Sequence, residues 1–60
     1  MITNIWTNAQ PNKKKSYPDC KPIILLPRPN GADIIKVVDL QDNEVFLAMA
    51  NTIARVEFRP

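Results

Sequence analysis

The chain has 60 residues, a formal net charge of +2, one cysteine and no histidine. This length excludes more than one domain, and a domain of this size buries only about 60% of the surface of its unfolded chain. A single cysteine excludes an internal disulfide and, without histidine, leaves almost no ligands for a structural metal. A thin core is therefore expected, stabilised by oligomerisation or by a partner.

The location of the protein is predicted from what the sequence lacks. No run approaches the ~20 apolar residues needed to cross a bilayer. The N-terminus has no charged segment followed by an apolar one, which is the pattern of a secretion signal. A lone cysteine is typical of a reducing compartment. We therefore expect a cytoplasmic protein that does not contact a membrane.

Charge is distributed unevenly between the two halves. Residues 1–31 carry five cations against one carboxylate, a net charge of +4. Residues 32–60 carry three cations against five carboxylates, a net charge of −2. This asymmetry predicts a basic arm on a mildly acidic body.

Residues 1–22 are predicted to form this extended basic arm. Met1 to Thr7 is apolar and β-branched, and suits a short strand or an arm that lays Trp6 in the core. Asn8 to Ser16 is polar and has no periodic apolar residue, which predicts a loop. Prolines on both sides of Asp19-Cys20 exclude a helix interior or a central strand there.

Residues 23–60 are predicted to form a β core. The apolar run at 23–26 lies between Pro22 and Pro27, which suits a short strand at a sheet edge. Asn30-Gly31 follows and predicts the sharpest reversal of the chain, because both residue types tolerate positive φ.

Residues 34–58 predict a three-stranded antiparallel meander. Two-residue turns at Asp42-Asn43 and Asn51-Thr52 would place nine residues on one face, eight of them apolar. These residues are Lys36, Val38, Leu40, Val45, Leu47, Met49, Ala54, Val56 and Phe58. In this register Lys36 lies opposite Met49, and Leu47 lies opposite Val56. The opposite face is apolar at one end, which needs cover from residues 23–26 or from another subunit.

A helix is the alternative for residues 44–56. Several apolar residues there fall on one helical face, and three alanines favour a helix. Against it, Leu47 would lie on the wet face, no glycine follows to cap the end, and the flanking runs are β-branched. Strands are therefore preferred.

The predicted fold is mainly β. We expect a small single domain at 1–60, built as an antiparallel sheet or as a partly open barrel that is similar in architecture to SH3-like barrels. The pattern identifies no family, and architecture does not decide function.

Enzyme chemistry has little material in this sequence. Without histidine, the commonest general base and metal ligand is missing. Ser16 and Cys20 have no evident base nearby, and the carboxylates Asp39, Asp42 and Glu44 lack the pattern of a Ca²⁺ loop. We expect no catalytic residue, no metal and no cofactor.

The lysine triplet is the feature with the clearest functional meaning. Lysines can neutralise phosphates, and a nearby aromatic ring can stack on an unpaired base. The candidate nucleic-acid-binding residues are Lys13, Lys14, Lys15, Tyr17, Lys21 and Arg28. The same lysines would also keep a small apolar protein soluble.

Two functions therefore remain open. The first is a small accessory or regulatory protein that binds DNA or RNA through its basic loop. The second is a protein-interaction module, such as an inhibitor or a small subunit, that docks through a sheet edge or an apolar face. A homodimer is expected with either function.

Overall fold

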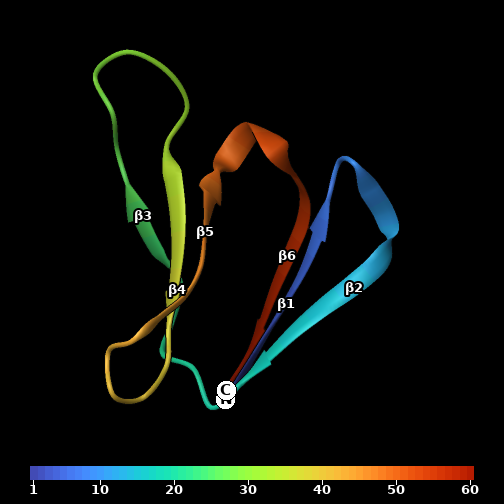
Figure 1. Cartoon of the computed structure of the whole chain (residues 1–60), viewed down its shortest axis with the longest axis vertical. Helices are drawn as coiled ribbons and strands as arrows, with labels where there is room; N and C mark the ends of the chain where they lie inside the picture. The colour runs from blue at the N-terminus through green and yellow to red at the C-terminus, as the bar shows by residue number, and fades with distance from the viewer.

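The computed structural model describes all residues, 1–60, and consists of six β-strands with one short 3-10 turn and no α-helix (Figure 1). The strands are β1 (Ile2–Thr7), β2 (Gln10–Pro18), β3 (Ile24–Leu26), β4 (Ile34–Val38), β5 (Glu44–Met49) and β6 (Ile53–Arg59). The 3-10 turn is η1 (Ala50–Thr52). The mainly-β prediction is confirmed.

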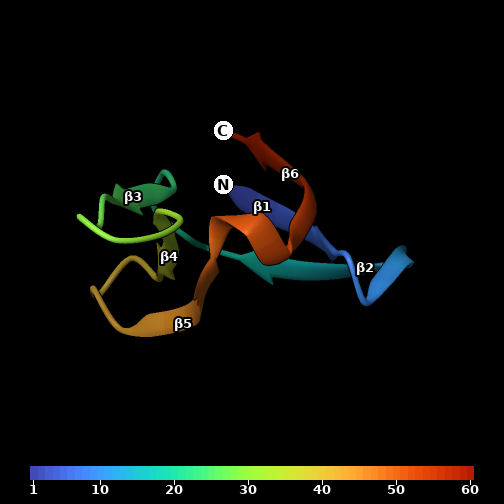
Figure 2. The ribbon, with the colours of Figure 1, turned by 90° about the horizontal axis from the view of Figure 1, so that it is seen from above.

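The strands form two antiparallel sheets, which lie beside each other in Figure 2. The first sheet has the order β2-β1-β6, and the second has the order β3-β4-β5. The chain crosses between them at Cys20, which forms an isolated bridge with Asp39, and returns through η1. Ile2 pairs with Arg59, so the two termini lie side by side (Figure 1). Of the two predicted architectures, this is the partly open barrel.

The core lies between the two sheets. Ile5 of β1, Cys20 and Val37 of β4 are fully buried at its centre. Around them pack Tyr17, Phe46, Ile53, Val56 and Phe58. Thr3 is buried beside them, and its Oγ1 shares a hydrogen bond with Cys20 Sγ at 3.0 Å. Only 7 of 60 residues are buried, so the core is thin.

The basic arm predicted for residues 1–22 is instead part of the first sheet. β1 is the central strand of that sheet, and β2 is its edge strand. The loop prediction for Asn8 to Ser16 is therefore wrong. A polar run with prolines can still form a strand at a sheet edge, because only one of its sides must pair. Trp6 is also not in the core, since it is half-buried on the outer side of β1.

The short strand predicted at 23–26 is confirmed as β3, an edge strand of the second sheet. Residues 27–33 connect it to β4. Gly31 has a φ of +131° there, which an L side chain rarely adopts.

The predicted meander is only half correct. β4 pairs with β5, but β6 leaves the second sheet and pairs with β1. The prediction of a hairpin at Asn51-Thr52 is wrong because these residues belong to η1. Thr52 Oγ1 donates to the Met49 carbonyl at 2.7 Å, and the Asn8 amide donates to the Thr52 carbonyl at 2.9 Å. These bonds hold η1 against the first sheet. The helix alternative for 44–56 is also wrong.

The turn between β4 and β5 is longer than predicted. It spans residues 39–43, because Asp39 Oδ1 accepts hydrogen bonds from the backbone amides of Gln41 at 2.9 Å and Asn43 at 2.8 Å. Asp42 takes the positive φ of 67° that this turn requires. As a result, Lys36 lies opposite Leu47, two residues away from the predicted partner Met49.

This shift of two residues leaves the faces unchanged, but the buried face is the opposite one. Ile35 and Val37 are buried, and they lie opposite Ala48 and Phe46. Leu47 and Met49, which belong to the predicted apolar set, are exposed. Both faces of this hairpin are apolar, so alternation alone could not decide which one faces the core.

Candidate nucleic-acid interface

The six residues predicted to bind nucleic acid lie in three places. Lys13, Lys14, Lys15 and Tyr17 are on β2, Lys21 lies between the two sheets, and Arg28 lies in the loop before β4. The fold therefore does not gather them into one site.

Tyr17 faces the core and does not face solvent. It lies opposite the buried Thr3, and its ring centroid is 5.6 Å from that of Phe46. A ring held in this way has no free face on which a base could stack. Its role in the structure is to join the two sheets.

Lys21 and Arg28 have partners within the chain. Lys21 Nζ lies 2.6 Å from Asp42 Oδ1. Arg28 Nε donates to the Ala32 carbonyl at 3.0 Å, and Arg28 Nη2 lies 3.2 Å from Met49 Sδ. These contacts brace the turn after β4 and the loop before it.

The lysine triplet is divided by the alternation of β2. Lys15 lies opposite the buried Ile5, so it belongs to the core side of the sheet, although it is exposed near the edge. Lys14 lies on the opposite side, the outer face of the first sheet. Of the six predicted residues, Lys14 alone lines the hollow on this face.

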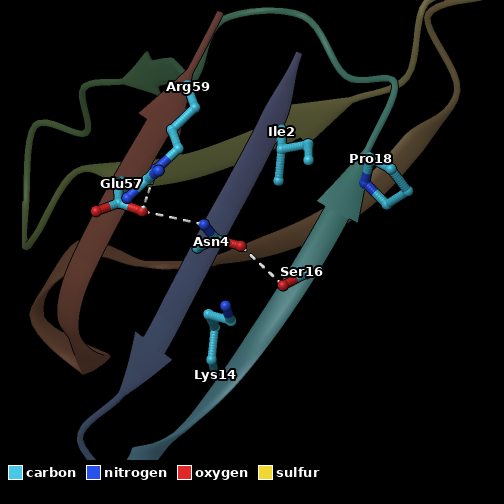
Figure 3. Close-up of a pocket in the computed structure, with 7 residues that line it drawn as sticks. All are labelled: Ile2, Asn4, Lys14, Ser16, Pro18, Glu57 and Arg59. Atoms are coloured by element: carbon cyan, nitrogen blue, oxygen red, sulfur yellow. Dashed lines mark hydrogen bonds and ion pairs between the residues drawn. The ribbon is translucent and has the colours of Figure 1, made fainter.

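The outer face of the first sheet contains an open hollow of about 390 Å³ (Figure 3). It is lined by Ile2 and Asn4 of β1, Lys14, Ser16 and Pro18 of β2, and Glu57 and Arg59 of β6. We call this the outer hollow. Its lining is mostly polar, and all three strands of the sheet contribute to it.

A row of hydrogen bonds crosses the floor of the outer hollow (Figure 3). Ser16 Oγ donates to Asn4 Oδ1 at 2.7 Å, and Asn4 Nδ2 donates to Glu57 Oε1 at 3.1 Å. Arg59 Nε donates to the same Oε1 at 2.9 Å. Asn4 is only 6% exposed, and its amide satisfies a neighbour on either side. The three strands are therefore held in register by side chains as well as by backbone.

Glu57 is the only carboxylate in the outer hollow. The hydrogen bond from Arg59, and then that from Asn4, lower the pKa of Glu57 below its ordinary value. Arg55 Nη2 also approaches it, at 3.4 Å. The charged Glu57 thus positions two arginines on the outer face.

An aromatic ring lies on the same face beyond the hollow. Trp6 lies opposite Arg55, and the guanidinium carbon of Arg55 is 4.9 Å from the Trp6 ring centroid, a cation–π contact. Together with Lys14 and Arg59, Arg55 makes three cations against one carboxylate, a net charge of +2.

Sequence reasoning missed Trp6, Arg55 and Arg59 as members of this face. The spacing of Arg55, Glu57 and Arg59 at every second residue indicates one face of a strand. That signal gains meaning only when β6 is known to pair with β1, which brings these residues beside Trp6 and Asn4.

The remaining reactive groups have structural roles. Cys20 is fully buried against Thr3. Hydrogen bonds from the Asn43 and Gln41 backbone amides lower the pKa of Asp39, with that of Asn43 the largest cause. No group of three or more side chains of the types that ligate metals comes together.

The chain matches no family model, no curated protein and no solved structure. Its one helical segment is the short turn η1, so the structure has no helix that could span a membrane.

Proposed function

We propose that this protein is a small, non-catalytic binding module that contacts nucleic acid through the outer face of its first sheet. The observation that carries the proposal is the grouping of Lys14, Arg55 and Arg59 around the outer hollow and the half-buried Trp6. Phosphate groups supply the negative charge that such a surface attracts.

The geometry suits an extended strand better than a compact ligand. Lys14 and Arg59 lie on the two outer strands of the sheet, with the hollow between them. Arg55 and Trp6 continue the same face toward the η1 end. Cations that track a phosphate backbone, with an aromatic side chain beside them, are typical of surfaces that bind single strands.

Edge protection also explains part of this charge. Lysines and prolines on an edge strand discourage pairing with other chains, and β2 carries both. That role accounts for all three lysines equally. It does not account for Arg55 and Arg59, because β6 is a different strand.

The test compares two neighbouring lysines that lie on opposite faces. Fluorescence anisotropy with labelled single-stranded and duplex oligonucleotides at low ionic strength should show binding that weakens with salt. Three phosphate contacts predict a slope of log K against log salt of about −2 on single strands and about −2.7 on duplex. Lys14→Ala should reduce the magnitude of this slope by about one contact, while Lys15→Ala, the matched control, should leave it nearly unchanged.

Three results would contradict the proposal. The first is the absence of salt-dependent binding to either form of nucleic acid. The second is an equal effect of Lys14→Ala and Lys15→Ala, which would indicate a general charge effect. The third is retention of full binding by the double variant Arg55→Ala/Arg59→Ala.

A second candidate function is protein interaction through the second sheet. Its support is a different surface, where large apolar side chains of β3 and β5 remain exposed. This candidate retains the non-catalytic role and replaces nucleic acid with a protein partner.

A further inference from the structure

The outer face of the second sheet is apolar and uncovered. In the register of this sheet, Leu26, Ile34 and Met49 form one row across the three strands. Ile24, Lys36 and Leu47 form the next row. We call these two rows the apolar face. The core lies on the opposite side of the sheet, where Ile35 and Val37 are buried.

The side chains of the apolar face are large and well exposed. Leu47 is 50% exposed, Met49 44%, Leu26 41% and Ile24 37%. Val45, at the start of β5, is exposed as well. Contiguous apolar surface of this kind is uncommon on small monomers and marks an interaction site.

The charges on this face argue against nucleic acid as its occupant. Lys36 is the only charged side chain in the two rows, and its Nζ lies 4.0 Å from Glu44 Oε1 at the start of β5. The pair cancels, so the face has no net attraction for phosphate. Its occupant must be apolar, with a balanced pair of charges.

We propose that the occupant is the same face of a second copy of this chain, related by a two-fold axis. In a two-fold contact the same patch meets itself, so each copy supplies whatever the other needs. The apolar rows match each other, and a face that carries both Lys36 and Glu44 can pair them with the partner subunit's Glu44 and the partner subunit's Lys36. Two sheets packed face to face in this way form a sandwich about 10 Å thick.

The thin core supports the same conclusion. This chain buries few residues and has no disulfide, so packing a second apolar layer on the sheet adds what its size denies it. A second core would then lie between the two copies. The second sheet would be covered on both sides.

The size of the face sets the expected strength. A standard interface takes about 800 Å² from each partner, about a fifth of the 4095 Å² surface of this chain. Three strands spaced about 4.8 Å apart and five or six residues long give a face of about 14 by 20 Å. This is below the standard area, so the dimer dissociates in the micromolar range.

The dimer would leave the outer hollow accessible, because the hollow lies on the first sheet and not on the second. The inference therefore does not rest on nucleic-acid binding. Each assembly would simply carry two copies of the outer face.

Sedimentation velocity or light scattering from about 1 μM to 1 mM tests the inference, with the wild-type chain passing from monomer to dimer in this range. Leu47→Lys buries an unpaired charge in the contact and should raise the dimer Kd by roughly 30-fold or more. Leu25→Lys is the matched control. Leu25 is 60% exposed on the same sheet, but it lies opposite the buried Ile35 and so on the other side. It should leave the dimer intact.

Leu26→Lys, on β3 of the apolar face, is a second variant in case Leu47→Lys does not fold by circular dichroism. Dilution of the wild-type protein followed by NMR needs no variant, and its amide shifts should change in β3, β4 and β5. A wild-type chain that stays monomeric at 1 mM would overturn the inference. So would equal dimer loss in the Leu25 and Leu47 variants, or shift changes confined to the first sheet.

Discussion

At the scale of single residues, Asp39 has the largest effect on chain direction. Its carboxylate accepts two backbone amides and the Asn43 side-chain amide, whose Nδ2 donates to Asp39 Oδ2 at 3.1 Å. Its own backbone amide donates to the Asn43 carbonyl at 2.9 Å. These bonds close a five-residue turn where the sequence pattern predicted a two-residue one, and they set the register of β4 against β5.

The same residue predicts a dependence of stability on pH. The pKa of Asp39 is lowered below its ordinary value of 3.8, so its ionised form stabilises the folded state above about pH 4. This contribution should be lost as pH falls through the lowered pKa. Asp39→Asn should therefore reduce the melting temperature at pH 7 and flatten its fall between about pH 5 and pH 2.

Melting curves recorded across that pH range provide the measurement for Asp39. Asp33→Asn is the control, because the exposed Asp33 side chain makes no hydrogen bond. Equal pH profiles for the two variants would show that the Asp39 turn does not contribute in this way. Glu57 has the same sign of shift and adds to the fall in the wild-type protein.

At the scale of elements, β2 shows how a polar run becomes a strand. Pairing with the central strand β1 supplies its backbone hydrogen bonds, and its other edge is open to solvent. Lysines and prolines there prevent the edge from recruiting another chain. A loop and a protected edge strand therefore have the same composition, which is why the sequence favoured the loop.

Edge protection gives a prediction of its own. Replacing Lys13, Lys14 and Lys15 with threonine keeps strand propensity and removes the charges. The variant should aggregate faster on mild heating, with a rise in thioflavin fluorescence or in light scattering. The matched control is Lys36→Thr, since Lys36 lies on the central strand β4, which has no open edge. Equal aggregation rates for the two variants would contradict a protective role for the β2 lysines.

At the scale of the whole molecule, stability depends on a few side chains that both sheets share. Ile5 contacts the core from the first sheet, Val37 contacts it from the second, and Cys20 lies between them at the crossing. Hydrogen bonds from Lys21 to the Val38 carbonyl at 3.0 Å and from Leu40 to the Asp19 carbonyl at 3.2 Å fasten that crossing to the end of β4. The two sheets therefore form one cooperative unit.

One methylene removed from this core should have a measurable cost. Ile5→Val should lower the free energy of unfolding by about 1 kcal/mol, because the small cavity cannot be filled by rearrangement. Ile2→Val makes the same chemical change on the same strand, but Ile2 is 42% exposed, and it should cost close to nothing. Urea titrations of both variants provide the comparison. A cost for Ile2→Val as large as that for Ile5→Val would place the core elsewhere.

Much of the local structure was accessible from the sequence because it depends on local properties. The β-branched runs of β1, β4 and β6, the proline-flanked β3 and the glycine before β4 each have a cause within a few residues. For the candidate site, the lysine triplet pointed to β2, although only Lys14 of the six predicted residues lines the outer hollow. Trp6, Arg55 and Arg59 could not be found in this way, because β1 and β6 meet from opposite ends of the chain.

Two features were decided only by the tertiary structure. A period of two determines which residues share a face, but the energy of burial depends on what lies opposite that face, and both faces of the β4–β5 hairpin are apolar. The partner of a strand is equally a long-range choice. β6 pairs with β1 and not with β5, because η1 is bonded to Asn8 and directs the chain onto the first sheet. Residue order alone specified the strands, and packing between distant strands specified the core, the outer hollow and the uncovered apolar face.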